Sequence, residues 1–144
     1  MQTRATAATT RHTTVEVDGL EIFYREGGDE ADPAVLLLHG FPTSSFMFRN
    51  LIPALADEFH LVAPDYPSYG HSAFPAKNEF DYSFERLYEI VLRFVDTIGL
   101  DTFSIYVQDY GALVGLRIAS RHPERVTALI VQNGNAYMDG FTPI

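Results

Sequence analysis

The stretch IYVQDYGA, residues 105–112, places an aspartate directly between an apolar strand and a predicted helix. An exposed aspartate carboxylate has a reference pKa of about 3.9, so it is ionised at neutral pH without help from a base. The dipole of the following helix stabilises that charge further. Asp109 therefore has the chemistry of a nucleophile. It also has the chemistry of a helix N-cap, which is a much commoner role for aspartate, and this stretch alone favours the cap.

The junction around Asp109 must be a sharp turn, because no loop separates the strand from the helix. Gly111 and Ala112 keep bulky side chains out of the turn, and Gly115 lets the helix pack closely. Such a turn is typical of a nucleophile elbow, whose usual form is Gly-x-Ser-x-Gly. In this chain aspartate stands at the position where that motif has serine.

Two further polar groups follow apolar runs. HGFP, made of His39, Gly40, Phe41 and Pro42, comes directly after AVLLL at residues 34–38, and Asp65 ends HLVAPD at residues 60–65. Continuous apolar runs of this length are expected of strands buried on both faces. In open α/β sheets, ligands bind beyond the carboxyl ends of such strands. We therefore expect these polar groups to meet Asp109 at one edge of a sheet.

Predicted strands and helices alternate along the chain. The strands are residues 14–17, 20–25, 34–38, 60–65, 103–107 and 126–131, and the helices are residues 46–56, 83–98 and 111–121. Asp18-Gly19 joins the first two strands in a hairpin, and Ser44 or Ser45 is the expected N-cap of the first helix. The alternation predicts an α/β fold, in which an antiparallel hairpin precedes a mostly parallel sheet and helices cover both faces.

The composition supports a single folded unit. The chain has 144 residues, 47% of them hydrophobic, and no cysteine. Its net charge of −9 argues against nucleic acid and anionic membrane surfaces as partners, because both require clusters of Lys and Arg. No apolar run approaches the length of a membrane span. We expect a flexible leader at residues 1–13, a folded region at residues 14–144, a cytoplasmic location, and neither metal nor cofactor.

Four motifs in order give the chain a family resemblance. They are HGFP, PDYPSYGHS at residues 64–72, the Asp109 turn and RHPERV at residues 121–126. Together they resemble the α/β-hydrolase superfamily, in which backbone N–H groups form an oxyanion hole. The resemblance implies that Phe41 and Tyr110 supply these N–H groups. The supporting residues it implies are His39, as a buried brace of the loop, and Gly40, Pro42 and Gly111.

One position departs from that pattern. Ser68 stands where the superfamily has glycine in the PDYPSYGHS turn. If the position requires a positive φ angle, serine there costs about 1 kcal/mol.

An aspartate nucleophile resembles the branch that holds epoxide hydrolases and haloalkane dehalogenases, which act on small molecules. In that chemistry a carboxylate attacks an sp3 carbon and forms an alkyl ester, and water then hydrolyses the ester. Dehalogenases of the branch use side-chain N–H donors for the halide, usually tryptophan at the position of Tyr110 and asparagine or tryptophan at the position of Phe41. The chain contains no tryptophan. We therefore favour an epoxide hydrolase-like reaction, with a haloalkane dehalogenase-like reaction as the alternative.

The resemblance also requires a base and an acid that the chain does not clearly supply. In the family the base follows the last strand, and none of the five histidines matches that place: His12, His39, His60, His71 and His122. The acid position after the sixth strand is Asn133, and Asp139 is close by in an Asp-Gly pair that is more often a turn. The chain therefore resembles the N-terminal half of a hydrolase without cap, acid or base.

Two consequences follow from this expectation. The strand at residues 126–131 would form an exposed apolar edge, which favours self-association. The chain would also be catalytically incomplete, and a non-catalytic truncated remnant is the rival interpretation.

Overall fold

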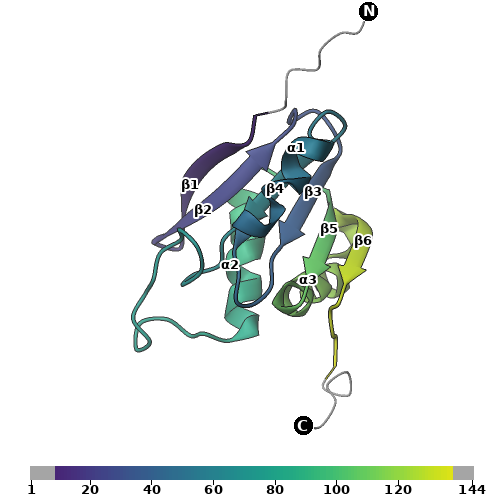
Figure 1. Ribbon diagram of the computed structural model, residues 1–144. Helices are drawn as coiled ribbons and strands as arrows, with labels where there is room; N and C mark the ends of the chain where they lie inside the picture. Colours follow the sequence, from purple (N-terminus) through teal and green to yellow (C-terminus); the bar gives the residue numbers. More distant parts are fainter. Residues whose placement is uncertain (1–8, 138–144) are drawn as a thin grey trace, which may run out of the picture.

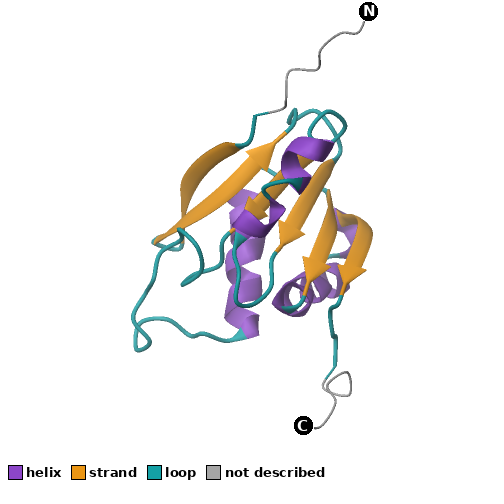
Figure 2. Ribbon diagram, viewed as in Figure 1, coloured by secondary structure: helices purple, strands orange, loops and turns teal. Residues whose placement is uncertain are grey.

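Six strands form one mixed sheet in the computed structural model, which describes residues 9–137 (Figure 1, Figure 2). Their order in the sheet is β1-β2-β4-β3-β5-β6. The strands span Arg11–Val17 (β1), Leu20–Gly27 (β2), Ala34–Leu38 (β3), His60–Pro64 (β4), Phe103–Gln108 (β5) and Val126–Gln132 (β6). β1 and β4 are antiparallel to β2, whereas β4, β3, β5 and β6 are parallel to one another. The predicted α/β fold is confirmed.

The N-terminal hairpin forms where Asp18-Gly19 predicted it. Asp18 has a φ angle of 50° and Gly19 of 76°, as a type I′ turn between right-handed strands requires. β1 begins at Arg11, so the expectation of a leader through residue 13 is wrong for its last three residues. Their side chains are polar and exposed. Their backbone nevertheless pairs with residues 24–26 of β2, so these residues form a strand.

Helices cover both faces of the sheet, as predicted. The helices α2 (Phe84–Thr97) and α3 (Tyr110–Arg121) pack on one face, and the short helices η1 (Ser45–Phe48) and α1 (Leu51–Leu55) pack on the other. A hydrophobic core lies on each face of the sheet, and β3 contributes side chains to both, because successive side chains of a strand point to opposite faces. Leu36 and Leu38 face the α2 and α3 side, and Leu37 faces α1.

The single helix predicted over residues 46–56 is wrong, because η1 and α1 are separate. Ser44 does cap η1, accepting a hydrogen bond from the Phe46 N–H at 3.2 Å. Pro53 explains the break. Proline lacks the N–H that would bond four residues back, and its ring clashes with that carbonyl, so a continuous helix cannot pass through Arg49.

The helix α2 begins and ends within one residue of its prediction. Ser83 accepts a hydrogen bond from the Arg86 N–H at 3.1 Å, which caps the first turn. Gly99 follows the C-terminus with a φ angle of 75°, a conformation that glycine adopts without steric cost. The longest helix of residues 9–137 is α2 with 14 residues, and none of these helices is long and apolar enough to cross a membrane.

β6 forms the edge of the sheet, and its side chains are poorly covered. Leu129, Ile130 and Val131 are 41%, 49% and 49% exposed. Because these residues alternate, apolar surface is open on both sides of the strand. The predicted exposed apolar edge is therefore present in the part of the chain that the structure describes.

Candidate active site

Four residues follow the carboxyl ends of the parallel strands, which all lie at one edge of the sheet (Figure 1). They are His39 after β3, Asp65 after β4, Asp109 after β5 and Asn133 after β6. The sequence predicted that the first three would share this edge, and the structure confirms it. The loop that begins at His39 donates a hydrogen bond to the side chain of Asp109.

Asp109 occupies the N-cap position of α3 but does not act as a cap. Its carboxylate makes no hydrogen bond to the first turn of the helix. Its φ and ψ angles are 53° and −119°, whereas a capping residue normally has extended geometry. Such a conformation costs a non-glycine residue on the order of 1–3 kcal/mol. The cap interpretation of Asp109 is therefore wrong, because the strained backbone turns the carboxylate away from the helix.

The carboxylate of Asp109 lies against the loop after β3 instead. The backbone N–H of Phe41 donates a hydrogen bond to Asp109 Oδ1 at 2.9 Å. Gly40 makes this approach possible, because a Cβ atom at that position would lie 2.5 Å from the Cβ of Asp109. Gly111 is needed for the same reason on the other side, since its Cβ would lie 2.3 Å from the Leu38 carbonyl oxygen. Two glycines thus allow the strand end, loop and helix to meet.

His39 braces this loop from inside the protein. Its side chain is fully buried, and its Nδ1 lies 2.9 Å from the carbonyl oxygen of Gly40. Since a carbonyl oxygen only accepts, Nδ1 carries the proton, and Nε2 accepts from the Tyr66 N–H at 3.4 Å. Burial lowers the pKa of His39, although Gly40 O and Asp65 act in the opposite direction. The ring of His39, with both nitrogens hydrogen-bonded, thus holds the loop in place. The peptide bond between Phe41 and Pro42 in this loop is cis.

The side chain of Asp65 holds the turn that follows β4 through its hydrogen bonds. It is buried, and its two oxygens accept hydrogen bonds from the Ser45 N–H at 2.7 Å and the His71 N–H at 2.9 Å. Gly70 packs so closely that a Cβ there would lie 1.9 Å from Asp65 Oδ2. Ser68 in this turn has a φ angle of 70°, so the strained conformation anticipated from the sequence is present.

Aromatic rings enclose Tyr110, the residue after Asp109. The Phe41 ring stacks on it at a centroid distance of 5.4 Å and an interplanar angle of 29°. The Phe84 ring meets it edge-on at 5.0 Å and 90°. Phe84 is a contact that the sequence did not suggest, because it is the first residue of α2 and no motif marks it.

A small cavity of about 40 Å³ opens beside the carboxylate, and this is enough for a water-sized group. It is lined by Asp109, Tyr110, Leu113, Asn133 and Asn135. Sequence reasoning missed Leu113 and Asn135. The position of Leu113 four residues after Asp109 on a helix is the signal that would have found it.

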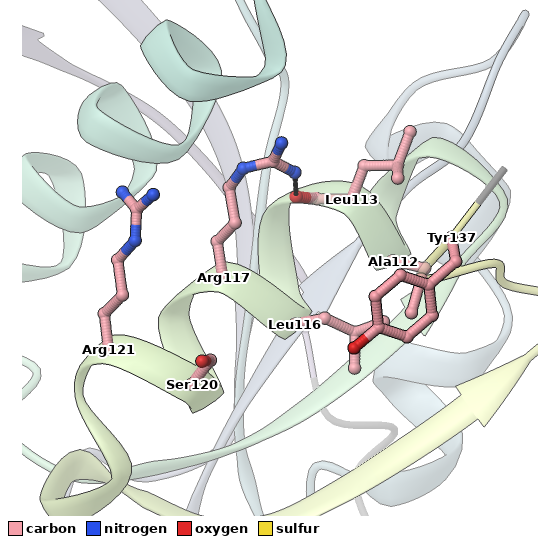
Figure 3. Close-up of a pocket in the computed structure, with 8 residues that line it drawn as sticks. Ala112, Leu113, Leu116, Arg117, Ser120, Arg121 and Tyr137 are labelled. Atoms are coloured by element: carbon pink, nitrogen blue, oxygen red, sulfur yellow. Dashed lines mark hydrogen bonds between the residues drawn. The ribbon is translucent and has the colours of Figure 1, made fainter.

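A wider cavity of about 320 Å³ lies along the outer side of α3 (Figure 3). Its charged residues are already engaged: Arg117 donates to the Leu113 carbonyl, and both Arg117 and Arg121 pair with Glu85. It contains no nucleophile in contact with a base. The small cavity beside Asp109 is therefore the candidate active site.

No second histidine of residues 9–137 joins the site. His12 contacts Arg25, His60 pairs with Glu26 at 2.7 Å, His71 packs on Phe23, and His122 bonds the Tyr88 hydroxyl at the far end of α3. Asn133 lines the cavity, as its position in the sequence suggested, but it is not a carboxylate. Asp139 lies outside the described residues.

Comparisons with known proteins add an independent line of observation. Residues 33–142 match a family described as alpha/beta hydrolase fold. The chain is 48% identical over 123 residues to an uncharacterized hydrolase of Saccharomyces cerevisiae, YNR064C, covering 85% of this chain and 42% of that protein. It is 40% identical over 116 residues to a haloalkane dehalogenase of Mycolicibacterium paratuberculosis, covering 80% of this chain and 38% of that protein.

Solved structures show the same likeness. A mutant epoxide hydrolase of Vigna radiata superimposes with a TM-score of 0.76 at 32% identity, covering 85% of this chain and 38% of that one. The chain thus spans about two fifths of the length of the curated relatives it matches.

Proposed function

The chain belongs to the alpha/beta hydrolase fold family, and on that premise we propose that Asp109 is the nucleophile of an epoxide hydrolase-like reaction. One observation carries the proposal. Asp109 holds a strained conformation at a helix N-terminus without capping the helix, and its carboxylate is bound by the Phe41 N–H instead. Strained residues of this kind cluster at functional sites, where the surrounding structure maintains them.

The hydrogen bond at Asp109 assigns different roles to its two oxygens. Oδ1 is held by Phe41, so Oδ2 is the oxygen that attacks an sp3 carbon of the epoxide. The new carbon–oxygen bond forms as a ring carbon–oxygen bond breaks, and the electron pair of that bond passes to the ring oxygen. The product is an alkyl ester of Asp109 whose carbonyl oxygen, Oδ1, still faces the Phe41 N–H.

The same loop amide serves the second half of the reaction. When water attacks the ester carbon, negative charge develops on Oδ1, where the N–H groups of Phe41 and Tyr110 stabilise it. Loss of one such donor typically costs about 10²–10³ in rate. The attacking water requires a base, and His39 cannot serve because both of its ring nitrogens are engaged. We propose that residues 9–137 supply ester formation and that the base for release lies outside them.

Two observations support the epoxide over a halide as the substrate group. The side chain of Phe41 offers no hydrogen-bond donor, and Tyr110 offers only a hydroxyl. The alternative, a haloalkane dehalogenase-like reaction, is supported by the 40% identity to a protein of that name.

Intact-mass measurement after incubation with 1,2-epoxybutane tests the proposal. We expect one adduct per chain in the wild type, located on Asp109 by peptide mapping, and none in Asp109→Ala. Asp101→Ala is the matched control, since Asp101 is an exposed carboxylate after α2 and should leave labelling intact. Labelling that survives in Asp109→Ala would refute the nucleophile. Failure of every epoxide and alkyl halide to label the folded wild type would favour the non-catalytic remnant.

We also propose that β6 mediates self-association of this chain, because its apolar side chains are open on both sides of an edge strand. Sedimentation over a range of concentrations should show association that Ile130→Lys reduces. A chain that remains monomeric throughout would refute this proposal.

A further inference from the structure

Most arginines of this acidic protein are paired with carboxylates, and the two exceptions share one aromatic neighbour. Ion pairs are formed by Arg11, Arg86, Arg93, Arg117, Arg121 and Arg125. Of the arginines in residues 9–137, only Arg25 and Arg49 form none. Because the chain has 19 acidic residues and a net charge of −9, two neighbouring arginines without carboxylates form an unusual local excess of positive charge.

The ring of Phe46 brings these two guanidinium groups together. The Cζ atom of Arg49 lies 4.6 Å from the ring centroid, and the Cζ atom of Arg25 lies 5.4 Å from it. Such contacts hold a guanidinium in place, but the ring carries no net charge and does not neutralise it. Phe46 is itself 52% exposed. The surface at η1 therefore presents an apolar ring with two cations against it.

Arg25 is the buried member of the pair, with only 7% of its surface exposed. A buried charge is normally paired, because its removal from water is costly. Here Nε donates to the Ser45 hydroxyl at 3.1 Å, and Nη1 donates to Nε2 of His12 at 2.7 Å. Arginine only donates, so Nε2 of His12 carries no proton and both acceptors are neutral. These bonds hold the guanidinium without cancelling its charge.

The carboxylate that hydrogen bonds link to Arg25 is Asp65, and the link passes through Ser45. The Ser45 N–H donates to Oδ1 of Asp65, and the His71 N–H donates to Oδ2. Within the part of the chain that the structure describes, no hydrogen bond or ion pair joins Asp65 to Arg25. Asp65 therefore acts on the charge of Arg25 only from a distance.

Arg25 keeps donor capacity that reaches the surface. A guanidinium has more N–H donors than the two bonds from Nε and Nη1 use. Among the described residues, every fully enclosed side-chain nitrogen or oxygen has a hydrogen-bond partner. Nη2 of Arg25 has no partner in residues 9–137, so it must be open to solvent although most of the side chain is buried. Guanidinium donors of this kind bind the oxygens of carboxylates and phosphates.

We propose that Arg25, Phe46 and Arg49 form a binding site for a small organic oxyanion, a carboxylate or a phosphate monoester attached to an apolar body. The oxyanion accepts hydrogen bonds from the two guanidinium groups, and the apolar body lies on the exposed ring of Phe46. None of these residues lines the cavity beside Asp109, so the site does not depend on the proposed reaction.

Titration of the full chain at constant ionic strength, followed by two-dimensional NMR of the backbone amides, tests the site. We expect benzoate, phenyl phosphate or both to shift the amide signals of η1 saturably, and the anion that binds identifies the group recognised. Benzyl alcohol lacks the charge and should bind at least about tenfold more weakly than that anion. Acetate and inorganic phosphate lack the apolar body and should also bind more weakly.

Three variants locate the binding. Arg49→Gln should weaken it by about tenfold or more. Arg25→Lys keeps the charge but loses the planar fork, so it should weaken binding as well. Arg93→Gln is the matched control, because it removes the same charge from an exposed arginine of α2 and should leave the affinity unchanged.

Circular dichroism establishes that each variant is folded, and Arg49→Gln alone decides the test if Arg25→Lys is not. The proposal is overturned if neither aromatic anion shifts the signals of η1 saturably, or if benzyl alcohol binds as tightly as the anions. An equal loss of affinity in Arg93→Gln and Arg49→Gln would also overturn it, because only the overall charge would then matter.

Discussion

Replacing Gly40 with alanine tests whether the close approach of the loop to Asp109 supports reactivity. A Cβ atom at position 40 would lie 2.5 Å from the Cβ of Asp109, 2.9 Å from its Oδ1 and 3.0 Å from the carbonyl oxygen of Gln108. Ordinary contacts of a Cβ begin at 3.4 Å. The loop and the strand end must therefore separate by nearly 1 Å or distort to a similar extent.

That displacement is large compared with the interaction it affects. The bond from the Phe41 N–H to Asp109 Oδ1 measures 2.9 Å, so a further separation of about 1 Å takes it beyond hydrogen-bonding range. The bond also positions the carboxylate for attack, and a misplacement of about 1 Å can cost about 10²-fold in rate. Overpacking of this kind also lowers the free energy of unfolding by about 1–3 kcal/mol. We expect Gly40→Ala to be folded, less stable and alkylated at Asp109 about 10²-fold more slowly, because the nucleophile is displaced.

Two measurements on each variant separate these effects. Urea titration followed by circular dichroism gives the free energy of unfolding, and intact-mass kinetics with 1,2-epoxybutane gives the rate of alkylation. Gly99→Ala is the matched control. Its φ angle of 75° makes alanine strained, but a Cβ there meets no atom within 4 Å, and the residue lies at the opposite end of α2 from Phe84.

The control should therefore lose about 1 kcal/mol of stability and keep its rate of alkylation. A folded Gly40→Ala chain that is alkylated as fast as Gly99→Ala would refute the reasoning, because the loop contact would then be irrelevant to the nucleophile.

Three further predictions concern strain and charge. Ser68→Gly should be more stable than Ser68→Ala by about 0.5–1 kcal/mol in urea titration, because both lose the hydroxyl and only glycine relieves the φ angle of 70°; equal stabilities would contradict a strained turn. Burial opposes the shift, but two arginines lower the pKa of Asp18 in the folded protein. The ionised side chain therefore stabilises the fold fully above the unfolded pKa, and this stabilisation is lost as pH falls through the lower folded pKa. Asp18→Asn should accordingly destabilise the protein at pH 7 in urea titration and have little effect well below the folded pKa, and a pH-independent difference would contradict this. Asp109→Gly should raise the free energy of unfolding by about 1 kcal/mol while abolishing alkylation, and a loss of stability would argue against strain at Asp109.

The sequence predicted those features that depend on neighbouring residues. β3 was located correctly because five apolar residues end abruptly at His39. The hairpin turn followed from Asp18-Gly19, and the positive φ angle of Ser68 followed from a motif position. These features share a local cause, since backbone preference and burial pattern can be read within a few residues of the chain.

Features that depend on distant residues could not be predicted in the same way. Phe84 reaches Tyr110 only because α2 and α3 pack on the same face of the sheet, and no pattern around Phe84 reports that contact. The division of η1 from α1 was visible in principle at Pro53, but the prediction treated residues 46–56 as one helix. At Pro53 the helix-breaking effect of proline was overlooked, whereas no neighbouring residue of Phe84 indicates its contact with Tyr110.

Asp109 shows how the two kinds of information combine. Its residue type and its place before a helix favour a cap, and a cap would have stabilised the helix at no cost to the backbone. The structure has the opposite arrangement: a positive φ angle, no capping bond and a carboxylate bound by Phe41, an amide 68 residues away in the sequence. A residue that lowers stability in two ways is difficult to explain by folding alone, because glycine would fit the backbone better and serine or asparagine would be equally good caps. What aspartate adds is a carboxylate that the Phe41 N–H holds beside the small cavity, which is the group that the proposed reaction requires.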